Sequence, residues 1–206
     1  MNLYDLHSNP RTLAGYKQRF QVPELAYEEA KRRAMRCRKR EERRSPDLES
    51  AIAKDPQYAY WYAKDIIYSR FTKAEPMIMK DPEGAYLYAS NVIGGRWPEA
   101  EPYIVKDPHW AEAYAHYVIG ARWPEAERSI AKNSQSAYNY ARDVIRGRFV
   151  DGEPIIMKDP EKATYYAYYQ LKHRWIEAER FIQKSPMWWD EYTKFFYDDF
   201  PFEQAM

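Results

Sequence analysis

The sequence contains one cysteine, Cys37, only seven glycines in 206 residues, and no long apolar run. A single cysteine excludes an internal disulfide framework and is typical of proteins in a reducing cytoplasm. The first 20 residues lack the apolar segment of a secretory signal peptide, and no segment approaches the roughly 20 apolar residues that cross a bilayer. We therefore expect a cytoplasmic protein without membrane association.

Sequence motifs of the common enzyme classes are also missing. There is no glycine-rich P-loop, no GxGxxG fingerprint and no GxSxG motif. His109 and His116 lie seven residues apart on one predicted helix, but no third ligand accompanies them at zinc-site spacing. Paired acids such as Glu99 and Glu101 recur along the chain, whereas a catalytic pair is normally built once. We expect no enzyme activity, no cofactor, no metal and no small-molecule substrate.

A lysine recurs at a constant spacing of 26 residues, four times in the triplet KDP. The six residues are Lys54, Lys80, Lys106, Lys132, Lys158 and Lys184. A constant period of this length indicates a stack of one supersecondary structure, because one repeat alone cannot bury its apolar face. Positions within a repeat are numbered below from this lysine as position 0.

The first part of each repeat is predicted to be a long helix. Position 1 is Asp, Asn or Ser, and position 2 is usually proline, a combination that caps and begins helices. Apolar residues follow at the spacing of a helix buried on one face. In the third repeat they are Ala111, Tyr114, Ala115, Val118 and Ile119. Glycines at the expected helix ends predict C-terminal caps. They are Gly94, Gly95, Gly120 and Gly147.

A shorter element completes the repeat. Pro76, Pro102 and Pro154 come too early for a long second helix, so we predict one short α or 3₁₀ turn and then another. The predicted ends are Ile78, Ile104, Ile130, Ile156 and Ile182. Arginine at position 16 and glutamate at position 21 also recur together, which favours a structural ion-pair ladder over a phosphate-binding surface. The predicted fold class is all-α, an α-solenoid of about six 26-residue repeats.

Three segments follow from this reading. Residues 1–21 are expected to be irregular, and residues 22–43 to form one long basic helix. Residues 44–206 are expected to form the solenoid. Its last repeat, 184–206, departs from the pattern and is predicted to be a C-terminal cap, which a solenoid needs to avoid growing end to end.

The string GRWPEAEPYIVKDP at residues 95–108, with its alternating Ala and Tyr nearby, resembles a repeat found in uncharacterised proteins of tailed bacteriophages. The resemblance extends over about residues 44–183. It implies an α-helical stack and a viral origin, hence the cytoplasm of the host cell. It supplies no catalytic residues.

Positions 3, 7, 10 and 14 of the long helix point away from the apolar stripe and are free to specify a partner. Exposed aromatic and arginine side chains dominate protein-binding hot spots. The candidate protein-binding residues are Trp61, Tyr68, His109, His116, Arg142, Arg146, Tyr165 and Tyr168. Packing between neighbouring repeats is the alternative role for the aromatic ones. We predict a non-enzymatic adaptor or inhibitor that binds and blocks a host or viral protein.

Residues 31–44 support an alternative function, nucleic-acid binding. This segment holds nine Lys or Arg and two Glu. Basic helical segments of this kind contact phosphate backbones, although a solvated helix face or an acidic protein partner fits as well. The candidate nucleic-acid-binding residues are Arg32, Arg33, Arg36, Arg38, Lys39, Arg40 and Arg43.

Overall fold

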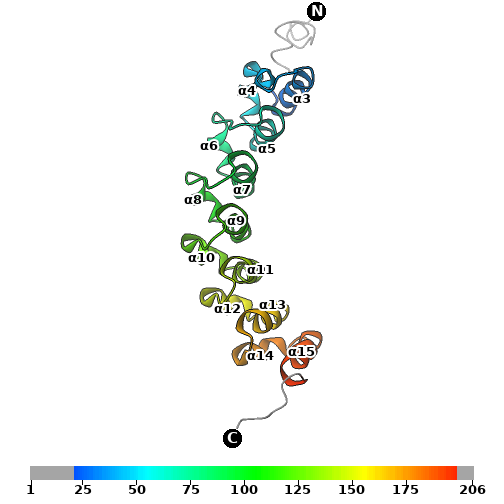
Figure 1. The fold of residues 1–206 in the computed structure, drawn as a ribbon, viewed down its shortest axis with the longest axis vertical. Coiled ribbons are helices and arrows are strands. Elements are labelled where there is room, and N and C mark those ends of the chain that lie inside the picture. Colours follow the sequence, from blue (N-terminus) through cyan, green and yellow to red (C-terminus); the bar gives the residue numbers. More distant parts are fainter. Residues whose placement is uncertain (1–20, 199–206) are drawn as a thin grey trace, which may run out of the picture. The chain divides into compact units, whose positions relative to one another are not determined.

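The structure is a computed structural model that describes residues 21–198. The described residues form helices and turns without a strand, and the helices repeat in one pattern (Figure 1). The predicted all-α repeat fold is confirmed. The chain divides into two compact units, Met1–Ile104 and Val105–Met206, called here the N-terminal and C-terminal halves. Residues 1–20 of the predicted irregular segment, and 199–206 of the predicted cap, lie outside the described residues.

Each long helix begins where the sequence predicts. The α-helical parts are α5 (Pro56–Trp61), α7 (Pro82–Tyr88), α9 (Pro108–Tyr114), α11 (Ser134–Asn139), α13 (Pro160–Tyr166) and α15 (Pro186–Thr193). The side chain at position 1 accepts from a free backbone N–H of the first turn in the first five of these, as at Asp55 and Asn133. Ser185 makes no such bond. Local capping chemistry therefore sets these boundaries.

The second half of each long helix is a π-helix. The segments are η2 (Tyr62–Ile67), η3 (Ala89–Ile93), η4 (Ala115–Ile119), η5 (Tyr140–Ile145), η7 (Ala167–Leu171) and η8 (Lys194–Asp198). Widening to i→i+5 bonds rotates the later residues away from a 3.6-residue stripe. In the third repeat Ala111, Tyr114 and Ala115 are buried as predicted, whereas Val118 and Ile119 are only half-buried.

In the first five repeats the left-handed residue that ends the long helix lies at position 14. Gly94 and Gly120 adopt φ of 72° and 67° there, as expected for C-terminal glycines. In the fourth repeat the left-handed residue is Arg146 (φ 58°), and Gly147 does not have positive φ. The prediction that Gly147 forms this cap is therefore wrong. Its amide nevertheless bonds to the carbonyl of Ala141, one residue farther than the π-helical bond.

The short helices end at the predicted isoleucines. They are α6 (Glu75–Ile78), α8 (Glu101–Ile104), α10 (Pro124–Ile130), α12 (Glu153–Ile156) and α14 (Ile176–Ile182), and a 3₁₀ turn, η6 (Val150–Gly152), precedes α12. Their lengths follow proline at position 22. Pro76, Pro102 and Pro154 limit the helix to four residues, because proline cannot donate a helical hydrogen bond beyond the first turn. Arg128 and Arg180 occupy that position in the two seven-residue helices.

The N-terminal helix is shorter than predicted. Helix α3 spans Pro23–Ala34, not 22–43, and the chain continues through a turn into the 3₁₀ helix η1 (Arg40–Arg43) and then α4 (Pro46–Ile52). Helix α3 buries Ala26, Tyr27, Ala30 and Ala34 along one face. In the next turn Cys37 continues that face but is only half-buried, and Arg36, Arg38 and Lys39 carry positive charges that repel one another. The chain turns there, and α4 packs against α3.

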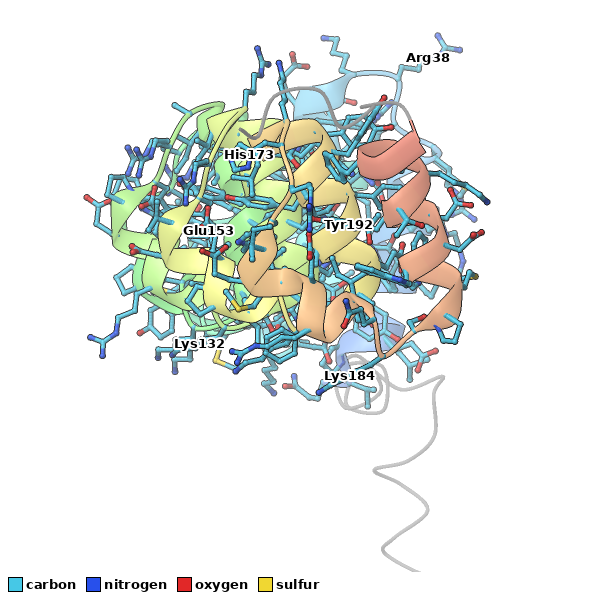
Figure 2. The ribbon with its side chains drawn as sticks, turned by 90° about the horizontal axis from the view of Figure 1, so that it is seen from below. Arg38, Lys132, Glu153, His173, Lys184 and Tyr192 are labelled. Atoms are coloured by element: carbon cyan, nitrogen blue, oxygen red, sulfur yellow. The ribbon has the colours of Figure 1, made fainter. Side chains whose placement is uncertain are left out.

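Within each half, a tyrosine at position 8 links a repeat to the one before it. The ring is buried, and its hydroxyl accepts from a backbone N–H and donates to a glutamate of the preceding repeat. These tyrosines are Tyr62, Tyr88, Tyr140, Tyr166 and Tyr192. For Tyr140 these partners are the Trp123 amide at 2.7 Å and Glu127 Oε1 at 3.0 Å. Figure 2 shows Tyr192 directed into the interior while Lys132 and Lys184 project outward.

The predicted Arg–Glu ladder completes this arrangement. Arg122 donates from Nε and Nη2 to both carboxylate oxygens of Glu127, at 2.8 and 2.9 Å. The same bidentate pair recurs in the other repeats, at Arg70–Glu75, Arg96–Glu101, Arg148–Glu153 and Arg174–Glu179. These arginines and glutamates are therefore structural, as the matched recurrence of both charges indicates.

Candidate functional site

The candidate site is a groove in the C-terminal half, between the fourth and fifth repeats. It encloses about 580 Å³ and is lined from α11 and η5 on one side and from α13 and η7 on the other. Its lining residues are Gln135, Tyr138, Arg142, Glu161, Lys162, Tyr165, Tyr169 and Gln170. The volume falls within the usual range of ligand-binding pockets.

Aromatic side chains form the apolar part of the groove. The Tyr165 and Tyr169 rings lie 6.2 Å apart, and Trp188 packs edge-on against Tyr165 at 5.4 Å. Tyr138 is buried on the opposite side, with the Arg142 guanidinium 5.3 Å from its ring centroid. Burial raises the pKa of Tyr138, so its hydroxyl is neutral at ordinary pH. Tyr169 is more than half exposed and available for contact.

The charged residues of the groove are already paired. Arg142 donates from Nε and Nη2 to the two carboxylate oxygens of the adjacent Asp143, at 2.8 and 2.7 Å. That pairing lowers the pKa of Asp143. Lys162 and Glu161 form a second pair at 3.0 Å. Charges held in this way orient a ligand but do not provide a free acid or base, so the groove suits binding better than catalysis.

One polar atom in the groove has an unmet hydrogen-bonding capacity. Gln170 Oε1 is buried and has no hydrogen-bond partner. Position 12 is a branched aliphatic residue in the four preceding repeats: Ile66, Val92, Val118 and Val144. A buried unsatisfied acceptor costs roughly 1–3 kcal/mol, so its presence calls for an explanation. A donor from a bound ligand would satisfy it.

The structure brings two of the predicted protein-binding residues, Arg142 and Tyr165, into this groove. Tyr168 lies beside it and stacks on Phe195, with ring centroids 4.3 Å apart. Tyr138, Tyr169 and Gln170 are groove residues that were not predicted from the sequence. The departure of Gln170 from the aliphatic pattern at position 12 is a sequence signal that could have identified it.

The other predicted binding residues lie elsewhere. In the N-terminal half Trp61 is half-buried and contacts Tyr27 and Tyr58, and so packs α3 against the first repeat. Tyr68 is exposed, and the Arg43 guanidinium lies 5.4 Å from its ring centroid. In the C-terminal half His109 and Arg146 are exposed. None of these four residues lines the groove.

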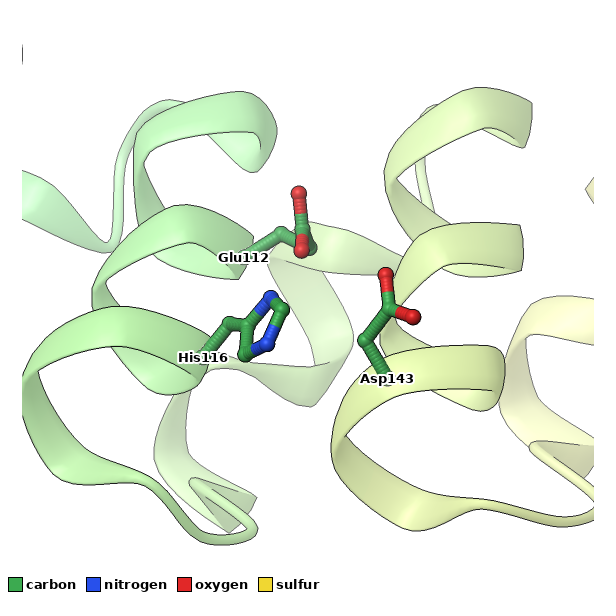
Figure 3. Close-up of side chains that lie close together, drawn as sticks. All are labelled: Glu112, His116 and Asp143. Carbon is green, nitrogen blue, oxygen red and sulfur yellow. The ribbon is translucent and has the colours of Figure 1, made fainter.

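His116 lies in a cluster that could hold a metal ion. Its imidazole and the carboxylates of Glu112 and Asp143 each offer a ligand atom, and these atoms lie within 4.8 Å of one another. Figure 3 shows Glu112 and His116 on one helix, facing Asp143 on the next. The sequence analysis found no third ligand for the histidines, because Asp143 comes from a different repeat.

The basic segment 31–44 is partly occupied by internal contacts. Arg32 pairs with Glu29, and Arg33 pairs with Glu29 and with both oxygens of Asp47. Arg44 pairs with Glu49. Of the predicted nucleic-acid-binding residues, Arg36, Arg38 and Lys39 remain exposed and make no ion pair with the described residues. The side chain of Arg40 is not among those described.

The chain matches no protein-family model, no curated protein and no solved structure. The resemblance of its repeat to bacteriophage proteins therefore stays a prediction. Within residues 21–198, none of the helices combines the length and apolar composition required to cross a bilayer.

Proposed function

We propose that this protein is a non-enzymatic protein-interaction module that binds a segment of a partner protein in the groove between the fourth and fifth repeats. The observation that carries the proposal is the buried, unpartnered Gln170 Oε1 inside an aromatic-lined groove. The role of an inhibitor of a host or viral protein belongs to the same proposal. It depends on the resemblance to phage repeats alone.

The chemistry of the groove indicates the kind of segment it would accept. A backbone or side-chain N–H of the partner would donate to Gln170 Oε1. An apolar or aromatic side chain would insert between Tyr138 and Tyr169, and the exposed Arg142 would contribute stacking and a positive rim. Tyrosine supplies contact area at a low cost in conformational entropy, and tyrosine and arginine are both enriched in binding hot spots.

The test combines partner capture with two substitutions. The immobilised protein is exposed to a bacterial lysate treated with nuclease, and the affinity of any retained protein is then measured by calorimetry. Tyr169→Ala is expected to weaken binding by about tenfold or more, because it removes an exposed aromatic contact. Gln170→Val is expected to weaken binding while raising the melting temperature, because valine restores the aliphatic residue of the other repeats and removes an unsatisfied acceptor.

Tyr117→Ala is the matched control. Tyr117 occupies position 11, the same repeat position as Tyr169, is also more than half exposed, and does not line the groove. Its substitution should leave affinity unchanged. Equal affinity of the wild type, Tyr169→Ala and Gln170→Val for the captured protein would contradict the proposed site.

Nucleic-acid binding through segment 31–44 is the second candidate, favoured by the exposure of Arg36, Arg38 and Lys39. Because each phosphate contact releases counterions, binding of this kind weakens steeply with salt. This candidate would be favoured by nucleic acid that co-purifies with the protein and is lost on nuclease treatment. Replacing the three residues by glutamate should then abolish that binding. The structure supports nucleic-acid binding less than it supports binding in the groove, because Arg36, Arg38 and Lys39 are its main support in the described part of the segment.

A further inference from the structure

Positions 6 and 11 of adjacent repeats face each other. In the N-terminal half Asn91, at position 11, donates from Nδ2 to the hydroxyl of Tyr60, at position 6 of the preceding repeat, at 3.0 Å. In the C-terminal half Tyr138 and Tyr169 hold the same two positions and line one groove. The side chains at these two positions are therefore neutral in both cases and able to form hydrogen bonds or aromatic contacts.

The third and fourth repeats place two acids at the same positions. Glu112 stands at position 6, where three other repeats have tyrosine, and Asp143 stands at position 11. Glu112 is only 5% exposed. Two carboxylates that face each other in a partly buried space repel, and burying a charged carboxylate is costly unless a cation compensates it.

A third group at the same place has the chemistry of a metal ligand. His116 lies one helical turn after Glu112, so both side chains project from the same face of the helix toward Asp143 (Figure 3). Ligand atoms about 2 Å from a shared ion lie about 3–4 Å apart. The observed separations within 4.8 Å therefore need only small side-chain rotations to close on one ion.

We propose that Glu112, His116 and Asp143 form a binding site for one divalent transition-metal ion, with Zn²⁺ the best fit, that clamps the third repeat to the fourth. An imidazole with two carboxylates is a ligand set that Zn²⁺ accepts, whereas Mg²⁺ and Ca²⁺ favour oxygen ligands alone. Three protein ligands leave one coordination position for water or for a group from a partner.

The surroundings of the cluster support a cation there. Glu112 is buried, so little water reaches its carboxylate to solvate the negative charge, and a bound ion would take the place of that water. Arg142 holds both oxygens of Asp143 from the outside, in the manner of the outer hydrogen bonds that orient metal-binding carboxylates. The positive charge of Arg142 already neutralises part of the negative charge of the two carboxylates. We therefore expect micromolar rather than tighter affinity for the ion.

The test uses the full chain without a purification tag. Calorimetric titration with Zn²⁺ is expected to show one site per chain, and a hundredfold excess of free ion over Kd should raise the melting temperature by roughly 5 °C. Replacing Zn²⁺ by Co²⁺ should give a visible d–d absorption. His116→Ala and Asp143→Asn should each lower affinity by at least tenfold, since ligand loss removes a metal bond.

His109→Ala is the matched control, because His109 is exposed on the same helix, seven residues from His116. It should retain the site and the Co²⁺ band. Absence of Zn²⁺ binding, or Zn²⁺ binding that survives both His116→Ala and Asp143→Asn, would overturn the proposal. Glu112→Gln separates the metal from a shared proton. If the site binds metal, the wild type shows the Zn²⁺-dependent rise in melting temperature and Glu112→Gln loses it. A wild type without any response to Zn²⁺, together with a more stable Glu112→Gln, would identify a proton-sharing pair instead.

Discussion

At the scale of the residue, the position-8 tyrosines make the fold sensitive to alkaline pH. Burial is the largest cause that raises the pKa of Tyr140 to about 12, and the neighbouring Glu127 adds to it. Tyr62, Tyr88, Tyr166 and Tyr192 are shifted in the same direction for the same reason. An unfolded tyrosine ionises near pH 10. The folded state therefore keeps these protons more tightly than the unfolded chain.

Below about pH 10 we expect these tyrosines to have no effect on the denaturant midpoint. As the pH rises from about 10 to 12, the midpoint should fall, because the unfolded chain releases protons that the folded chain keeps, and this stabilises the unfolded state. Chemical unfolding followed by helicity across this range measures the effect. Tyr140→Phe should flatten the slope slightly, and should cost about 1–3 kcal/mol at neutral pH by leaving the Trp123 amide and Glu127 without their partner. A midpoint that is flat to pH 12 would contradict this assignment.

At the scale of the element, the left-handed residue at position 14 ends the wide turn of each long helix. Glycine adopts this conformation without penalty, but Tyr68, Arg146 and Lys172 also adopt it, with φ of 51°, 58° and 60°. A side chain there costs roughly 1–2 kcal/mol, partly offset by the greater entropy of glycine in the unfolded chain. These three helix ends therefore carry local backbone strain.

Arg146→Gly is accordingly expected to raise the free energy of unfolding by about 0.5–1 kcal/mol, measured by denaturant melts. Gly120→Ala, at the same repeat position, should lower it by about 1 kcal/mol. Gly147→Ala is the neighbouring control, since Gly147 lacks positive φ and a Cβ there meets nothing within 4 Å. A loss of stability in Arg146→Gly would show that the arginine side chain contributes more than its backbone costs.

At the scale of the whole molecule, the equal length of the repeats predicts that one can be removed without breaking the contacts between the others. Deletion of residues 132–157 joins Ala131 to Lys158 and brings Tyr166 to the place of Tyr140. Its hydroxyl would then meet the Trp123 amide and Glu127. We expect a shorter, helical and cooperatively folding chain, measured by circular dichroism and thermal melting.

Deletion of half a repeat, residues 132–144, is the matched control. It shifts the register by 13 residues and leaves Glu127 without a tyrosine from the next repeat, so we expect loss of helicity or aggregation. Equal folding of the two deletions would show that the position-8 tyrosine does not couple neighbouring repeats.

The sequence alone determined the period, the start of each long helix and the end of each short one. These features depend on contacts within a few residues: the Asp or Asn that caps its own helix, the proline in its first turn, and the arginine five residues before its glutamate. Because the same signals recur in repeat after repeat, a chance pattern is excluded. For the same reason the Arg–Glu ladder could be predicted from the sequence to be structural.

Tertiary structure decided which residues of neighbouring repeats contact one another. Within each half, the hydroxyl of a position-8 tyrosine reaches a glutamate 13 residues earlier, as Tyr140 reaches Glu127, and Asp143 meets Glu112 across 31 residues. The same holds for the end of α3 at Ala34, where the chain turns so that α4 can pack against it. Helix periodicity places a side chain on a face, but the neighbour packed against that face determines whether the side chain forms core, groove or ligand cluster.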